Sequence, residues 1–144
     1  MQKHLNFAKG LLIGFMLYSS VTQANCPAMN KVVYKCVNIG NKQHCNWMAP
    51  WWDGYHGSAD TKPGEHPVKF IEVFWGASAA PEVGSTNCFY QDHEGGWVEL
   101  SQNSWGGVAK PTSDNWTPGE WPENLKISGL ICNQGIADCQ FAYG

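Results

Sequence analysis

The polar residues of this 144-residue chain offer few combinations that could carry out a reaction. Asp92, His93 and Glu94 are adjacent, and a histidine beside carboxylates is a common arrangement for general acid–base catalysis. Gly95 and Gly96 follow them, and charged residues in a glycine-bearing hairpin loop are more often simply solvated. The sequence also lacks the G-x-S-x-G turn of serine hydrolases. We therefore assign no catalytic residue and expect a protein that is not an enzyme.

Two carboxylates could cleave a glycoside if they met in a cleft. The acidic residues available for this are spread along the chain, and their spacing brings no two of them together: Asp53, Glu72, Asp92, Glu94, Glu99 and Glu120. The only local group typical of a metal site is Asp53 with His56, whereas a site needs three or four ligands. We expect neither a metal ion nor any other cofactor.

The six cysteines are the clearest structural signal: Cys26, Cys36, Cys45, Cys88, Cys132 and Cys139. An even number in an exported chain predicts disulfides, and the lack of a C-x-x-C pair argues against zinc. Sequence alone does not select among the many possible pairings. Cys36 and Cys45 flank one turn, and Cys132 and Cys139 flank another. These two pairs are therefore favoured, which leaves Cys26 with Cys88 by elimination.

Residues 1–24 are typical of a cleaved secretory signal peptide. Lys3 and Lys9 precede or flank a short apolar run, and Thr22-Gln-Ala24 supplies the small residues that a signal peptidase reads. The apolar run is too short to span a membrane, although an uncleaved anchor is the alternative. We expect a mature chain of residues 25–144 that is periplasmic and has no membrane span.

The charge distribution excludes several classes of partner. Loss of Lys3 and Lys9 would change the net charge from −3 to −5. Every basic residue is a lysine and there is no arginine, so the bidentate recognition of phosphate is missing. Nucleic acid and anionic lipid therefore have little electrostatic basis as partners.

The elements that would position these residues are predicted to be β-strands. Seven short segments are rich in β-branched and aromatic residues: 32–37, 43–47, 68–75, 86–91, 97–102, 125–132 and 139–143. Segment 68–75 is apolar on both faces and should be central, and the last two segments should form a hairpin. No amphipathic helix is evident. We predict one all-β domain, a small disulfide-stabilised antiparallel sandwich or barrel of six to seven strands.

Two long stretches, 48–67 and 104–123, have no strand or helix period and carry most of the tryptophans. Tryptophan and tyrosine dominate binding hot spots and stack on sugars, but in a small domain they also complete the core. We expect Trp75 and Trp97, which lie in strands, to be core residues. One or two of the loop tryptophans should be exposed at an interface, and the candidate binding residues are Trp51, Trp52, Tyr55, Trp116 and Trp121.

Several short motifs point to a family. They are Cys26-Pro27 after the signal, Cys45-Asn-Trp47, Trp51-Trp-Asp-Gly54, residues 70–75, Cys88-Phe-Tyr90 and the region of Trp116. Through them the chain resembles a family of small exported bacterial proteins with a Cys-Pro start and a Cys-x-Tyr strand. It is similar to members that support type IVB (Dot/Icm) secretion in intracellular Gram-negative pathogens. The resemblance implies a periplasmic, non-enzymatic factor for effector translocation and intracellular replication, and it supplies no catalytic residues.

We therefore expect a protein that binds protein partners, among them secretion-system components. One alternative is a glycan- or peptidoglycan-binding module that uses Trp51, Trp52 and Tyr55 as a stacking platform. Another is a periplasmic inhibitor of a host enzyme such as lysozyme. The apolar loops also leave a homodimer open.

Overall fold

The described part of the chain is built almost entirely of β-strands. The computed structural model describes residues 22–54, 57–77, 84–102, 109–121 and 127–143. Within them, eleven strands form two antiparallel sheets, and one short 3-10 helix, η1 (Met29–Lys31), precedes the second strand. The prediction of an all-β, disulfide-stabilised fold is confirmed.

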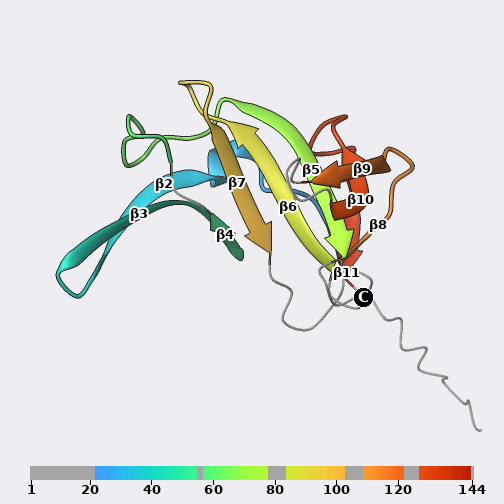
Figure 1. Ribbon diagram of the computed structural model, residues 1–144, viewed down its shortest axis with the longest axis horizontal. Coiled ribbons are helices and arrows are strands. Elements are labelled where there is room, and N and C mark those ends of the chain that lie inside the picture. Colours follow the sequence, from blue (N-terminus) through green and yellow to red (C-terminus); the bar gives the residue numbers. More distant parts are fainter. Residues whose placement is uncertain (1–21, 55–56, 78–83, 103–108, 122–126, 144) are drawn as a thin grey trace, which may run out of the picture.

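The larger sheet has eight strands and is open (Figure 1). Their order is β2 (Val33–Ile39), β3 (Lys42–Ala49), β4 (Trp52–Gly54), β7 (Trp97–Gln102), β6 (Gly84–Gln91), β5 (Lys69–Ala77), β10 (Ile127–Cys132) and β9 (Thr117–Trp121). Since β2 and β9 are its two ends, the sheet does not close into a barrel. The smaller sheet has the order β1 (Thr22–Ala24), β11 (Phe141–Tyr143) and β8 (Ala109–Pro111). The architecture is sandwich-like.

All seven predicted strands are present, but the strand count was too low. Four further strands, β1, β4, β8 and β9, have three to five residues each, and three of them lie in stretches expected to be loops. The predicted hairpin of the last two segments is wrong. β10 pairs with β5 and β9 in the larger sheet, whereas β11 pairs with β1 and β8 in the smaller one.

The core lies on one face of the larger sheet. Strand alternation places Val98 and Leu100 of β7 on this face, with Cys88 and Tyr90 of β6 beside them. Further buried residues come from the other strands: Tyr34, Trp47, Trp52, Val73 and Cys132. The smaller sheet contributes Phe141, whose ring meets the ring of Trp52 edge-on at a centroid distance of 6.3 Å.

The disulfide pairings are those favoured by the sequence. Cys36–Cys45 and Cys132–Cys139 are short-range, and Cys26–Cys88 joins residues 62 positions apart. Cys132–Cys139 connects the larger sheet to the segment before β11 and so ties the two sheets together. Three disulfides indicate an oxidising, extracytoplasmic compartment. Among the described residues, no helix has the length and hydropathy needed to cross a membrane.

The expected signal-peptide boundary falls within the smaller sheet. Thr22–Ala24, the residues expected just before the cleavage site, form β1 and pair with β11. Cleavage after Ala24 would remove this strand and leave β11 paired with β8 alone. The cleavage itself stays a prediction.

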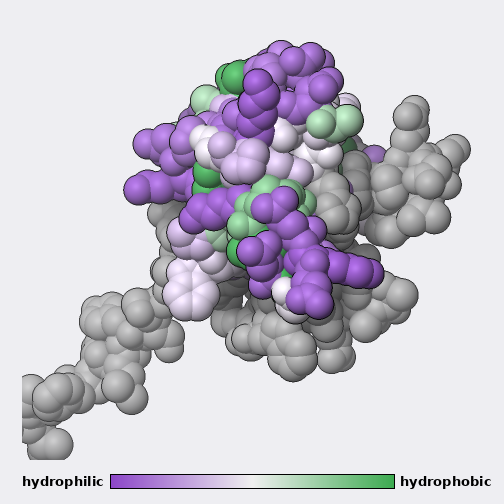
Figure 2. Space-filling model, turned by 90° about the vertical axis from the view of Figure 1, so that its left-hand side faces the viewer, coloured by the Kyte–Doolittle hydropathy of each residue, from purple (hydrophilic) through white to green (hydrophobic). Residues whose placement is uncertain are grey.

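The β2–β3 hairpin extends away from the other strands (Figure 1). We call its outer part, residues 35–46, the arm. Its turn is Gly40-Asn41, with Gly40 at a φ of 61°, and Cys36 pairs with Cys45 across the two strands. Figure 2 views the molecule from the side to which the arm projects and shows a mainly hydrophilic surface broken by small apolar patches.

Candidate functional site

The β3–β4 turn presents one tryptophan to solvent. β3 ends at Ala49 and β4 begins at Trp52, so only Pro50 and Trp51 make the turn. Trp51 has a φ of 70°, and 91% of the side chain is exposed. A proline followed by a residue with positive φ is the pattern of a type II turn, which favours glycine or asparagine at the second position. For a tryptophan this backbone conformation costs about 1–2 kcal/mol.

A shallow depression of about 620 Å³ lies beside this turn. Met48 and Asp53 are register partners and share one face of the sheet, and Asn46, two residues before Met48, lies on the same face. The Oδ1 atom of Asn46 is buried and has no hydrogen-bond partner. The lining also includes Trp51. We call these four residues the Trp51 surface; it combines an indole, a thioether and two oxygen acceptors.

Of the other candidate binding residues that the structure describes, only Trp52 lines the same depression as Trp51. Trp52 is only 8% exposed and packs into the core against Phe141. Trp116 is partly buried against the core, and its Nε1–H donates a hydrogen bond to the Gln140 carbonyl at 3.0 Å. Trp121 ends β9, at the opposite end of the larger sheet from the arm. Tyr55 lies outside the described residues.

Trp97 is not a core residue, contrary to our expectation. Its side chain is 62% exposed and meets Phe89 edge-on at a centroid distance of 5.7 Å. The reason is strand alternation: Val98 and Leu100 face the core, so Trp97 and Glu99 face the other way. The alternation of side chains over residues 97–100 is the sequence signal that predicts this orientation.

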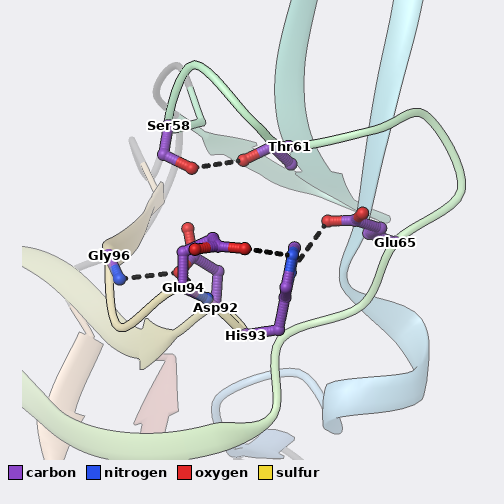
Figure 3. A network of polar contacts seen from close by, with 7 residues as sticks. All are labelled: Ser58, Thr61, Glu65, Asp92, His93, Glu94 and Gly96. Atoms are coloured by element: carbon purple, nitrogen blue, oxygen red, sulfur yellow. Dashed lines mark hydrogen bonds and ion pairs between the residues drawn. The ribbon is translucent and has the colours of Figure 1, made fainter.

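The Asp92-His93-Glu94 group joins two loops (Figure 3). His93 lies between two carboxylates, with Nδ1 at 3.1 Å from Oε2 of Glu65 and Nε2 at 3.0 Å from Oε1 of Glu94. The buried carboxylate of Asp92 accepts hydrogen bonds from the backbone N–H groups of Glu94 and Gly96. Both ring nitrogens of His93 therefore face groups of the protein itself. This arrangement holds the loops together and leaves neither nitrogen directed at a substrate.

Two carboxylates that are distant in the sequence lie in the same row across the larger sheet. In the register, Glu72 of β5 and Glu99 of β7 are both partners of Phe89 on β6. Their α-carbons are therefore about 10 Å apart, with Phe89 between them. Burial raises the pKa of both carboxyl groups above the ordinary value of 4.5, and for Glu99 hydrogen bonds from Asn87 and Ser101 oppose the shift. The assignment of the chain as a non-enzyme stays a prediction.

These two raised pKa values predict a stability that falls as the pH rises. The folded state binds the two protons more tightly than the unfolded state, so stability is lost from about pH 4.5 upward until both groups are ionised. The double variant Glu72→Gln/Glu99→Gln should melt at a higher temperature than the wild type at pH 7 and show a flatter pH dependence. Thermal unfolding from pH 4 to 8 measures both. Substitution of the exposed Glu120 by Gln controls for the loss of a surface carboxylate. Equal slopes in the wild type and the double variant would contradict the prediction.

Nothing in the described residues assembles a metal centre. No group of three or more histidine, cysteine, aspartate or glutamate side chains there could hold an ion. Asp53 of the suggested Asp53/His56 pair is on β4, and His56 lies outside the described residues. Comparisons with protein-family models, curated proteins and solved structures found no match to this chain. The Trp51 surface and its neighbours are therefore the features from which a function can be inferred.

Proposed function

We propose that this chain is a periplasmic, non-enzymatic accessory factor that binds a protein partner through the Trp51 surface. The observation that carries the proposal is Trp51 itself, 91% exposed in a turn that disfavours it. Neither its exposure nor its positive φ contributes to folding stability. Backbone strain of this kind is typically found where a side chain must be held for a ligand, and tryptophan is the residue most enriched in binding hot spots.

The neighbours of Trp51 favour a basic side chain on the partner. The exposed Asp53 carboxylate can accept hydrogen bonds, and the described residues that line the depression include no lysine. An indole face attracts a lysine or arginine cation, and a carboxylate adds a charge-assisted hydrogen bond. Met48 provides an adaptable apolar contact beside them. We infer that the partner inserts a lysine or arginine here.

The cellular role that we propose is based on the oxidising compartment and on the resemblance to small exported bacterial proteins. The disulfides indicate an oxidising compartment, for which the periplasm is our proposal. Through the resemblance to small exported bacterial proteins, EirA, a protein essential for intracellular replication, is the functional parallel that we propose. We propose that the chain supports type IVB secretion in a Gram-negative pathogen in the same way.

A glycan-binding role has less support. A stacking platform needs the indole faces of both Trp51 and Trp52, and although Trp52 lines the same depression, it is buried and its ring packs against Phe141. Inhibition of a host enzyme such as lysozyme would use the same Trp51 surface toward a basic protein. Both alternatives are distinguishable outcomes of the experiment below.

Substitution of Trp51 by glycine should strongly weaken partner binding without destabilising the fold. Glycine adopts positive φ readily, so the melting temperature should be unchanged or slightly higher. Loss of a tryptophan hot spot typically costs at least about 2 kcal/mol, a loss of about thirtyfold in affinity. The measurement is affinity capture of the tagged periplasmic protein after crosslinking, scored for secretion-system components.

The matched control is Trp97→Ala, which removes a second exposed tryptophan away from the depression and should leave capture intact. Equal recovery of secretion components with Trp51→Gly would refute the assignment of the surface. Trp51-dependent retention on peptidoglycan, without any secretion component, would identify a glycan binder. Trp51-dependent inhibition of lysozyme would identify an inhibitor.

A further inference from the structure

The outer edge of β2 is only partly paired. β2 is an end strand of the larger sheet, and the loop before β5 covers its outer edge at Tyr34. There the N–H of Tyr34 donates to the Glu65 carbonyl at 3.0 Å, and the N–H of Gly64 donates to the Tyr34 carbonyl at 2.8 Å. Backbone groups alternate in direction along a strand, so those of Cys36 and Asn38 point to the same outer side. Among the described residues, these four groups have no backbone partner.

The arm holds this free edge in a fixed extended shape. The Cys36–Cys45 disulfide crosses the two strands next to the free groups, and β2 and β3 pair in register from Val33 to Ile39. A strand edge that is already extended loses little conformational entropy when a further strand binds to it. The arm also projects away from the other strands, which leaves room for that strand (Figure 1).

Apolar side chains accompany the free edge. Val37 is 42% exposed and Ile39 is 64% exposed, and their spacing places both on the same face of the arm. Exposed edge strands with β-branched residues are templates for strand addition, which proteins ordinarily block with charges or proline. Here the edge residues of β2 include one lysine, Lys35, and no proline.

The charge of the arm differs from that of the rest of the chain. Residues 1–52 contain no acidic residue, so all 12 acids lie from Asp53 onward. Lys35 and Lys42 make the arm cationic within a chain of net charge −3, and both are exposed. Pairing of two arms from separate copies would bring like charges together, whereas an acidic strand would meet opposite charge.

We propose that the outer edge of β2 binds an extended acidic segment of a partner protein, which adds to the larger sheet as a ninth strand. Main-chain hydrogen bonds to Cys36 and Asn38 would supply affinity, and Lys35 with Lys42 would select for acidic side chains. The free backbone groups lie on the outer edge of β2, but Lys35 is the register partner of Asn46, so this surface adjoins the Trp51 surface. Asn38→Pro removes an edge N–H and Trp51→Gly removes the indole, so the two proposals can still fail independently.

The probe is a soluble peptide of about eight residues with alternating glutamate and valine, added to the oxidised, isotope-labelled protein. Hydrogen exchange followed by NMR should show the amides of Cys36 and Asn38 protected on binding. A peptide of alternating lysine and valine is the matched control and should bind at least about tenfold more weakly. No protection at millimolar acidic peptide, or equal binding of both peptides, would overturn the proposal.

Two variants test separately the main-chain hydrogen bonds of the β2 edge and the charge of its lysines. Asn38→Pro removes one outward N–H and should weaken peptide binding by about tenfold, since proline is tolerated at a sheet edge. Lys35→Glu/Lys42→Glu should reverse the preference between the two peptides, and Lys110→Glu, on β8, should not. Unchanged affinity in the first variant, or an unreversed preference in the second, would contradict the proposal. A dimer in sedimentation equilibrium that Asn38→Pro abolishes would show that a second copy occupies the edge instead.

Discussion

Replacement of Cys26 and Cys88 by alanine is expected to lower the free energy of unfolding by about 4 kcal/mol, the largest loss among the three disulfides. This bond closes the longest loop, with a sequence separation of 62, and the entropy that a crosslink removes from the unfolded chain grows with loop length. Both cysteines are buried, and Cys88 lies on β6 in the middle of the larger sheet. A loss of this size is a large part of the 5–15 kcal/mol typical of small domains.

The same bond also positions a buried hydrogen bond. The hydroxyl of Tyr90 donates to the carbonyl of Pro27, next to Cys26, at 2.7 Å. Burial raises the pKa of Tyr90, so the hydroxyl keeps its proton and remains a donor. Without the disulfide, the segment before η1 can leave this position and expose Tyr90 to water.

Urea unfolding of the oxidised proteins tests this expectation. The control is Cys36→Ala/Cys45→Ala, which removes a disulfide between two half-buried cysteines with a sequence separation of 9. The entropy model gives about 2.7 kcal/mol for that bond. Equal losses in the two double variants would show that loop length and burial do not govern the contribution of these bonds.

Most of the strands could be predicted from local patterns in the sequence. The seven long or strongly patterned strands carry β-branched and aromatic residues between turn-forming ones, and this is sufficient to identify them. β4 and β8 have only three residues each, and β9 contains a proline and a glycine, which are uncommon in strands. Their pairing also depends on neighbours far away in the sequence. The split of β10 and β11 between two sheets has the same cause, because a short connection between strands ordinarily predicts a hairpin.

The candidate site was harder to predict from the sequence, because the exposure of each side chain depends on the register of the strands. Trp51 and Trp52 are adjacent and chemically identical, yet one is in the turn and the other on the core face of β4. Pro50 was the signal that could have distinguished them, since proline often begins a tight turn and would place Trp51 at its second position. Asn46 and Met48 could not be linked to Trp51 without the β3–β4 pairing.

Gly54 connects the fold to both proposed binding surfaces, and its replacement by alanine is expected to cost at least about 3 kcal/mol. β4 lies between β3 and β7, and so attaches the arm and the Trp51 turn to the rest of the larger sheet. A β-carbon at Gly54 would overlap the backbone carbonyl of Trp47 and press on the side chain of Leu100. Trp47 is fully buried in the core, and a backbone atom cannot move aside as a flexible side chain can.

The control for this prediction is Gly40→Ala in the turn of the arm. No atom lies within 4 Å of a β-carbon there, so the cost should be only the roughly 1 kcal/mol of a positive φ. Urea unfolding gives both free energies, and hydrogen exchange identifies the amides that lose protection. Gly54→Ala should deprotect β3, β4 and the arm before β5 and β6, because the connection through β4 is the one that fails. Loss of protection spread evenly over the larger sheet would instead mean that the arm and the remaining strands unfold as a single unit.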